Sequence, residues 1–528
     1  MHETSLDQSS LSHKIVRNTF FNIAGRFWGI AVAIFLTPYI IRHIGVERYG
    51  IWALVGVITG YFGLLDFGIG SSFVKYIAEF SARKKYGEIN SLINTGFIFY
   101  SVLGLVLIGL AAVSMGFLLF LLKILGAFHD EASFVIFLGV VLFVGSNALS
   151  PFVALQTGLQ RMDIINKISI AVSIPSILGT VYFLERGFGL QGLMINNAIV
   201  FVMTSAVNMV IAFRILPGLR INVMKFDRAM FAKLFKFGYR VQLARISGVV
   251  TSQTDKILIV YFLGIGLVTY YQLGSSMVYY AISVCGLLVS ALMPALTEIE
   301  AKGDREVLVD AYLRSVKYLS AVTVPIFVFL IVIASKVIFI WMGLGYGKAI
   351  LVIRILCVGF MINTIAQAAS AVCMAIDRPQ FLSTASIIIV FLSVGLSIAL
   401  VKIFGFFGIA WGSALAVNIG TIYFLSKLHS ALQVPLRKLF SKIAIYLIPS
   451  VAAAAMAGAV DLVVMAQGIT VTRVMALWMA VIQFLIFALV YFGWVYYARL
   501  FDLRDVEFVQ QKIPFLYWFW CAVRGQRT

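Results

Sequence analysis

Charged residues are scarce in this chain. Asp, Glu, Lys and Arg make up 12% of the 528 residues, whereas 62% of the residues are hydrophobic. Soluble globular domains carry about 25% charged residues, so the composition excludes a water-soluble fold. The 44 Phe, 22 Tyr and 8 Trp residues also exclude an intrinsically disordered chain. The composition therefore predicts an integral membrane protein.

Cysteine and histidine are rare as well. The four Cys residues show no paired or metal-type spacing, and the five His residues lie in tails, loops or the ends of hydrophobic runs. A phosphate-binding glycine loop and a nucleophile–histidine arrangement are both missing. We therefore expect no catalytic residues, no metal, no cofactor and no enzymatic activity. An integral-membrane glycosyltransferase or polymerase would normally carry a large outer loop, whereas the outer loops here are short.

Hydrophobic runs long enough to cross a bilayer recur along the whole chain. A transmembrane helix needs about 20 apolar residues. The sequence accordingly predicts an all-α integral membrane fold with about 14 transmembrane helices, near residues 18–41, 50–72, 91–119, 132–158, 167–184, 188–213, 238–262, 267–293, 317–342, 349–375, 381–402, 406–428, 441–463 and 472–498.

Basic residues outnumber acidic ones, 41 to 22, which gives a formal charge of +19. With the N-terminus inside, the inner segments hold 29 Lys and Arg residues and the outer segments hold 8. This asymmetry follows the positive-inside rule, so it indicates topology rather than a nucleic-acid partner. The polar N-terminal segment has two acids before its first base and does not resemble a cleavable signal peptide. We expect a multi-pass protein of the bacterial cytoplasmic (inner) membrane with both termini in the cytoplasm.

Short matches recur at a nearly constant separation, which indicates an internal repeat. Ile44-Gly45-Val46 corresponds to Leu263-Gly264-Ile265 at 219 residues, and Gln160-Arg161 corresponds to Asp377-Arg378 at 217. Six spans separate the matches, so the fold should contain two six-helix lobes related by a parallel pseudo-twofold, plus two extra C-terminal helices. Parallel repeats are typical of transporters. The expected parts are a tail (1–17), an N-lobe (18–213), a cytoplasmic amphipathic linker (214–237), a C-lobe (238–430), an accessory helix pair (431–499) and a second tail (500–528).

Several motifs resemble those of a known family. The run Ile44-Gly45-Val46-Glu47-Arg48-Tyr49-Gly50-Ile51-Trp52, followed by Gly63-Leu64-Leu65-Asp66-Phe67-Gly68, resembles the start of bacterial polysaccharide-biosynthesis flippases. These form the O-antigen-translocase-like branch of the multidrug/oligosaccharidyl-lipid/polysaccharide exporter superfamily. The resemblance implies that the chain moves a polyprenyl-pyrophosphate-linked oligosaccharide from the cytoplasmic to the outer leaflet by alternating access.

Two arginines within spans are the candidate pyrophosphate-binding residues. Arg26 lies about eight residues into the first span, roughly 12 Å along a helix axis. Arg245 lies at a similar depth in the seventh span and is its repeat equivalent. Guanidinium groups bind phosphate oxygens in a bidentate manner and stay charged at physiological pH. Two alternatives stay open: each arginine could reach the inner membrane interface, or could pair with a carbonyl group at a helix C-terminus.

Other polar residues within spans are candidates for the substrate cavity or for coupling. Asn22 and Gln242 lie one helical turn from the two arginines, on the same helix faces, and could hydrogen-bond sugar hydroxyls. Asp66 could contact substrate, or could pair with a nearby base such as Arg26 or Lys75. Asp255 could form an ion pair with Arg354 rather than with the adjacent Lys256. That pair could be a cation or proton site, or a fixed link between helices.

The sequence therefore predicts a lipid-linked oligosaccharide flippase whose partners are its substrate, membrane lipid, a polysaccharide polymerase and glycosyltransferases. Two alternatives remain open. One is a small-molecule/cation antiporter of the same superfamily, and the other is a non-transporting membrane scaffold in polysaccharide assembly. The sequence does not specify which sugar repeat is carried, which ion drives transport or which oligomeric state the protein adopts.

Overall fold

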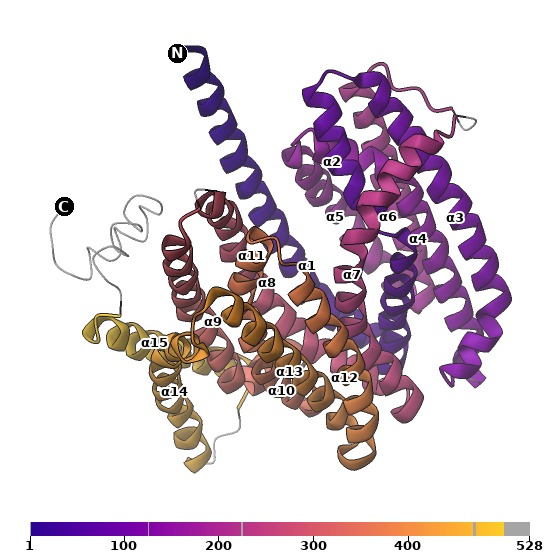
Figure 1. Ribbon diagram of the computed structural model, residues 1–528. Helices are drawn as coiled ribbons and strands as arrows, with labels where there is room; N and C mark the ends of the chain where they lie inside the picture. Colours follow the sequence, from indigo (N-terminus) through magenta and orange to yellow (C-terminus); the bar gives the residue numbers. More distant parts are fainter. Residues whose placement is uncertain (1, 125, 223–224, 302, 468–470, 501–528) are drawn as a thin grey trace. The chain divides into compact units, whose positions relative to one another are not determined.

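The computed structural model describes residues 2–124, 126–222, 225–301, 303–467 and 471–500. Most of these residues are helical, turns and loops connect the helices, and no strand occurs among the described residues. Figure 1 shows the helices in chain order. They are α1 (His2–Phe62), η1 (Gly63–Asp66), α2 (Ile69–Ala82), α3 (Tyr86–Leu121), η2 (Gly126–Phe128), α4 (His129–Gly158), α5 (Met162–Glu185), α6 (Gly189–Ile215), α7 (Arg228–Leu263), α8 (Gly266–Ala301), α9 (Arg305–Met342), α10 (Gly347–Ile365), α11 (Gln367–Ala375), α12 (Gln380–Phe404), α13 (Phe406–Leu432), α14 (Leu436–Ala466) and α15 (Arg473–Tyr497).

The predicted all-α membrane fold is confirmed. Twelve helical stretches within the described residues are long and apolar enough to cross a membrane. The first of them, Ala24–Asp66, covers two predicted spans, because α1 contains a kink at Gly45. Helix α7 covers the seventh predicted span but is not among the twelve. The predicted number of about 14 spans is therefore not confirmed.

The helices pack into two units. The first comprises the described residues of Met1–Tyr280 and Pro379–Phe424, and the second comprises those of Ala281–Arg378 and Leu425–Thr528. Helices α8 and α13 each contribute to both units. This division concerns packing, and the predicted lobe boundaries, which concern the repeat, stay predictions.

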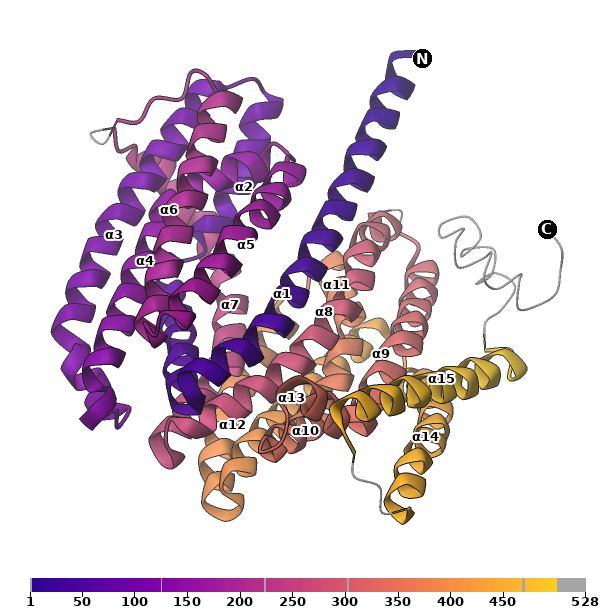
Figure 2. The ribbon, with the colours of Figure 1, turned by 180° about the vertical axis from the view of Figure 1, so that it is seen from behind.

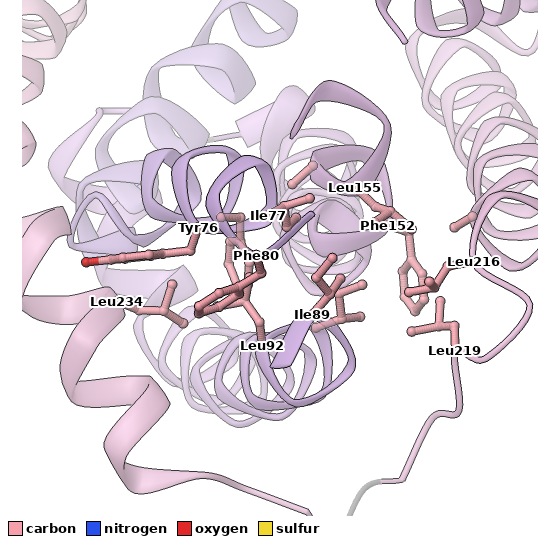
Figure 3. Close-up of a cluster of buried hydrophobic side chains, with 14 of the residues drawn as sticks. Tyr76, Ile77, Phe80, Ile89, Leu92, Phe152, Leu155, Leu216, Leu219 and Leu234 are labelled. Atoms are coloured by element: carbon pink, nitrogen blue, oxygen red, sulfur yellow. The ribbon is translucent and has the colours of Figure 1, made fainter. Parts of the chain in front are cut away.

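In the first unit, α3, α4 and α6 run side by side, as both ribbon views show (Figures 1 and 2). A cluster of buried aromatic and aliphatic side chains fills one end of this bundle, where α2, α3 and α4 meet the segment around Leu216–Leu219 and the start of α7. Phe73, Phe80 and Phe152 are all at most 1% exposed there. Figure 3 shows Leu234 of α7 beside Tyr76 and Phe80 of α2 in this cluster.

The predicted amphipathic linker is attached firmly to the first unit. Polar side chains of α3 bind its backbone: Asn94 Nδ2 donates to the carbonyl oxygen of Arg220 (2.8 Å), and Asn94 Oδ1 accepts from the N–H of Asn222 (2.7 Å). The N–H of Asp227 donates to Thr95 Oγ1 (3.2 Å). Helix α7 then runs from Arg228 to Leu263, so the end of the predicted linker and the seventh predicted span form one helix. The apolar face at the start of this helix is buried against α2 and α3.

In the second unit, the two C-terminal helices pack against α9. Helix α14 contacts α9 and α15, and α15 also contacts α9 (Figure 2). The hydroxyl of Tyr491 on α15 donates to the carbonyl oxygen of Ala321 on α9 (2.7 Å). Gln483 Nε2 on α15 donates to the carbonyl oxygen of Ala457 on α14 (3.0 Å). These bonds satisfy buried polar groups between helices where the bilayer supplies no water.

The backbone supports the predicted internal repeat. Residues with positive φ recur in five corresponding pairs, separated by 216 to 219 residues: Gly45 and Gly264, Lys84 and Gly303, Gly126 and Gly343, Gln160 and Asp377, and Gly189 and Gly405. Positive φ is uncommon outside glycine and marks specific turns. The two halves therefore turn at matching positions between matching helices.

Other positive-φ residues have no counterpart in the repeat, and two of them lie together at a break in a helix. Phe67 (φ 52°) and Gly68 (φ 71°) follow the short 3₁₀ turn η1, whereas the residues 219 positions later lie within α8. The span predicted near residues 50–72 is therefore not one continuous α-helix, because the chain leaves the α-helical conformation between Phe62 and Ile69. A Cβ atom on Gly68 would lie 2.2 Å from the carbonyl oxygen of Gly238 on α7. The close approach of these two backbones requires glycine at the break.

Candidate functional site

Arg26 lies on α1, close to two residues of the same helix, Gly25 and Trp28, that pack against α5. The neighbouring Gly25 packs closely against α5, since an added Cβ would lie 2.3 Å from Asn166 Oδ1 and would require the Asn166 side chain to move. Trp28 Nε1 donates to Ser173 Oγ on α5 (2.8 Å). Adjacent helical positions point about 100° apart, and the Arg26 side chain is exposed. An exposed guanidinium within a membrane span is suited to bind an anion or to reach a hydrated surface.

The predicted partners of Arg26 are only partly described. Arg245 belongs to α7, but its side chain and that of Asn22 lie outside the described residues. Whether the two guanidinium groups face one pyrophosphate therefore stays a prediction.

Gln242 lies one turn before Arg245 and is buried at 6% exposure. Its Nε2 donates to the carbonyl oxygen of Leu64 in η1, at the interruption of the helix. The Oε1 atom of the same amide is buried and lacks a hydrogen-bond partner among the described residues. Gln242 thus links α7 to the broken helix, and its contact with a substrate cavity stays a prediction.

Asp66 is the last residue of η1 and is also buried. Its carboxylate accepts hydrogen bonds from the hydroxyl of Tyr100 on α3 and from the backbone N–H of Gly70 (3.2 Å). A cavity of about 10 Å³ lies beside Asp66 and Tyr100, bounded also by Asn147 of α4. This volume suits about one water molecule and is too small for a sugar. The structure therefore places Asp66 and Gln242 together at the helix break.

Asp255 lies at the centre of a hydroxyl network in the first unit. Its carboxylate accepts from the hydroxyls of Tyr271 on α8 and Ser413 on α13, the latter at 2.5 Å. Ser413 Oγ lies 3.2 Å from Ser393 Oγ of α12. Asp255 is 2% exposed, so these hydroxyls replace water around the carboxylate. The network joins four helices through one acid.

The other two candidates of this group make separate contacts. Lys256 Nζ donates to Gln253 Oε1 one turn earlier (2.9 Å). Arg354 is exposed in the second unit, where its Nε donates to the carbonyl oxygen of Ile331 on α9 (3.3 Å). Because Asp255 and Arg354 belong to different units, their pairing stays a prediction.

Several polar groups at these contacts were not predicted from the sequence. Tyr100, Tyr271 and Ser413 escaped notice because a hydroxyl in an apolar run gives no distinctive signal. The pair of Lys336 on α9 and Asp461 on α14 did give one, since both charges fall inside predicted spans. Lys336 Nζ binds Asp461 Oδ1 and holds the penultimate helix against α9.

The chain is similar to known proteins in both sequence and fold. A family model described as polysaccharide biosynthesis protein matches residues 15–300. The chain is 22% identical over 365 residues to a protein of Shigella flexneri named as an O-antigen transporter, which covers 67% of this chain and 83% of the relative.

Solved structures show the same fold. The lipid II flippase MurJ, in an inward closed conformation, gives a TM-score of 0.68 at 16% identity and covers 92% of this chain and 99% of its own. An inward-facing multidrug resistance MATE family transporter of the MOP superfamily gives 0.65 at 16% identity, over 79% of this chain and 95% of its own.

The relatives are transporters and flippases by name, not enzymes, and the predicted resemblance is confirmed. The family model spans more than half of the 528 residues. This multi-pass membrane protein therefore belongs to the polysaccharide biosynthesis protein family and has the helical fold found in MurJ and MATE transporters.

Proposed function

We propose that the protein is a flippase that moves a polyprenyl-pyrophosphate-linked oligosaccharide from the cytoplasmic to the outer leaflet of the bacterial inner membrane. The observation that carries this proposal is family membership across residues 15–300, together with the O-antigen transporter among the relatives. The fold of a lipid II flippase supports it, because lipid II is also a lipid substrate. Alternating access would expose the substrate site first to the cytoplasm and then to the outside.

Arg26 and Arg245 are the proposed ligands of the pyrophosphate. Each comes from an equivalent helix of the repeat, and the repeat is supported by matching backbone turns. Two guanidinium groups could bind the phosphates with bidentate, charge-assisted hydrogen bonds. The substrate would be supplied by glycosyltransferases and passed to a polysaccharide polymerase, and both termini would lie in the cytoplasm.

Leaflet exchange of a labelled lipid tests this function directly. Purified protein is reconstituted into liposomes with a fluorescent polyprenyl pyrophosphate that carries a sugar, and a membrane-impermeant quencher reports how much lipid reaches the other leaflet. The proposal predicts rapid exchange with the protein and slow exchange in protein-free liposomes. Equal slow rates in both would contradict it and would favour a scaffold without transport.

A small-molecule/cation antiporter is the second candidate, and one observation favours it. Asp255 provides a buried carboxylate within the first unit, which is the kind of group that a cation antiporter needs. The same liposomes separate the two functions when they are loaded with a fluorescent organic cation. Exchange of the cation against a proton or sodium gradient, without exchange of the lipid, would favour the antiporter.

A further inference from the structure

The first unit contains a groove that the proposed arginine site does not use. It has a volume of about 470 Å³ and lies between α4 and α6, with the part of α1 around Val55–Thr59 at its base. Small-molecule sites in proteins usually enclose about 300–1,000 Å³ and are mostly apolar, with a few polar groups that fix the ligand. The groove has this size and composition.

Helix periodicity explains how α4 and α6 line the groove. On α6, Asn197, Phe201 and Thr204 follow one another at spacings of four and three residues, and therefore share one face. On α4, Leu142, Ser146 and Leu149 repeat the same spacing. Each helix thus contributes a stripe in which polar side chains alternate with apolar ones.

Three polar side chains in the groove are available for a ligand. The Asn197 amide and the Ser146 hydroxyl are exposed, the Ser205 hydroxyl is half-buried, and none of the three hydrogen-bonds another described residue. The adjacent Asn196 is different, because its Nδ2 donates to the Ser176 carbonyl oxygen (2.9 Å) and to Thr180 Oγ1 (3.1 Å). Two neighbouring asparagines therefore differ in role: Asn196 connects α6 to α5, whereas Asn197 faces the groove.

The groove carries no charged side chain among its lining residues. It therefore lacks the groups that would hold a pyrophosphate or an organic cation. The rings of Phe143 and Phe201 line it instead. A sugar ring matches this lining. Its apolar C–H face can pack on an aromatic ring, and its hydroxyls can donate and accept hydrogen bonds. An amide such as Asn197 can also do both.

We infer that this groove binds an uncharged sugar ring of the transported glycan. The inference rests on the proposed flippase function and adds to it a separate specificity site, within one unit, for the sugar rather than the pyrophosphate. A prenyl chain would bury the same apolar wall, but it would leave the amide of Asn197 and the hydroxyls of Ser146 and Ser205 unpaired, at a cost in free energy.

Binding of two natural lipids tests this inference. The first is the lipid-linked glycan extracted from membranes of the source cells, and the second is polyprenyl pyrophosphate without a glycan. Affinities are measured for purified protein in nanodiscs. Wild-type protein should bind the glycan-bearing lipid more tightly. In the N197V/S205A double variant this preference should fall about fivefold or more, the effect of losing about 1 kcal/mol in hydrogen bonds, while affinity for the glycan-free lipid stays unchanged.

Two further variants make the outcome unambiguous. S146L fills the groove and should remove the preference for the glycan in the same way. Ile199→Val changes an exposed α6 residue outside the groove and should bind both lipids as the wild type does. Equal losses for both lipids in S146L would assign the groove to the prenyl chain and overturn the inference, as would an unchanged preference in N197V/S205A. Failure of the wild type to bind either lipid would instead contradict the proposed function itself.

Discussion

Gly45 and Gly264 have nearly the same backbone conformation although they are 219 residues apart. The dihedral angles are φ 84° and ψ 169° at Gly45, and φ 99° and ψ 162° at Gly264. Each glycine separates one hydrophobic helix from the next at the same point of the repeat. This region of φ and ψ is almost restricted to glycine. Glycine therefore suits this turn in both halves, because other residues adopt the conformation only at a cost in free energy.

Alanine at either glycine should destabilise the protein. A non-glycine residue in this conformation costs about 1–3 kcal/mol. We expect G45A and G264A each to lower the midpoint of thermal unfolding in detergent by similar amounts. Gly56→Ala is the matched control, because Gly56 lies in regular helix with open space around it and should tolerate a methyl group. Equal midpoints for wild type and G45A would show that the turn adapts to a side chain.

Tyr100 and Asp66 should depend on each other for their contribution to stability. A buried hydrogen bond to a charged group is worth about 1.5–3 kcal/mol, so Y100F should destabilise by about that amount. Y100F in a D66N background should cost less, because the charged acceptor is gone. A double-mutant cycle measured by thermal unfolding gives the interaction energy.

Tyr39→Phe is the control for Y100F, because it also removes a tyrosine hydroxyl that donates to a carboxylate. The hydroxyl of Tyr39 donates to Glu185 Oε1 (2.6 Å), but the Glu185 side chain is 62% exposed, so water can replace the bond. Additive effects of Y100F and D66N would mean that the two side chains act independently.

Removing one partner of the Lys336–Asp461 pair should destabilise the protein, whereas replacing both partners with apolar residues should change its stability little. Removing one partner of a fully buried ion pair typically costs about 3–5 kcal/mol, because the other charge remains uncompensated, and the cost should be smaller for K336M, which leaves the partly exposed Asp461. We expect K336M and D461L each to destabilise the protein, with α14 losing its contact to α9. The K336M/D461L double variant should recover most of the wild-type midpoint in thermal unfolding. A double variant less stable than both single variants would contradict this account.

Asp227 should make a pH-dependent contribution at the start of α7. Its carboxylate accepts from the backbone N–H of Met230, from the hydroxyl of Ser91 and from the N–H of Ala229, and these bonds lower the pKa of Asp227. A lowered pKa stabilises the folded state above the unfolded value of about 3.9, and the benefit is lost as pH falls through the lower folded value. D227A should cost about 1 kcal/mol at pH 7, the usual loss of a helix cap.

Unfolding midpoints measured over a range of pH distinguish the contribution of the Asp227 helix cap from that of the Asp227 charge. The difference between wild type and D227A should shrink below about pH 4, as the wild-type carboxylate becomes protonated. D227N keeps a capping oxygen without a titrating group, so it should be more stable than D227A and lose nothing through that range. A wild-type advantage over D227A that grows toward acid pH would contradict the assigned sign.

Sequence patterns anticipated the helices because their signal is strong and local. Runs such as 132–158 and 188–213 coincide closely with α4 and α6, since about 20 apolar residues have few stable alternatives in a bilayer. Matches at a constant separation also anticipated the repeat, which the paired turns support.

The interruption at Gly63–Gly68 was not predictable in the same way. It depends on the backbone of Gly68 meeting that of Gly238, which lies 170 positions away along the chain. The hydrogen-bond donors Tyr100 and Ser413 were not predictable for the same reason, because their roles depend on which helices become neighbours. The continuous α7 also depends on tertiary contacts, since Leu234 and Met230 are buried by α2 and α3 and not by lipid.

We propose that Arg26 and Arg245 together bind the pyrophosphate of the transported lipid. The most direct measurement is leaflet exchange of the fluorescent sugar-bearing lipid by the R26Q/R245Q double variant in liposomes, compared with wild type and with Arg42→Gln, which neutralises an exposed arginine on the same helix. All three proteins are first checked for equal reconstitution and thermal stability. Our account predicts that R26Q/R245Q loses nearly all exchange, whereas R42Q retains it. Wild-type exchange by a well-folded R26Q/R245Q protein would contradict the claim.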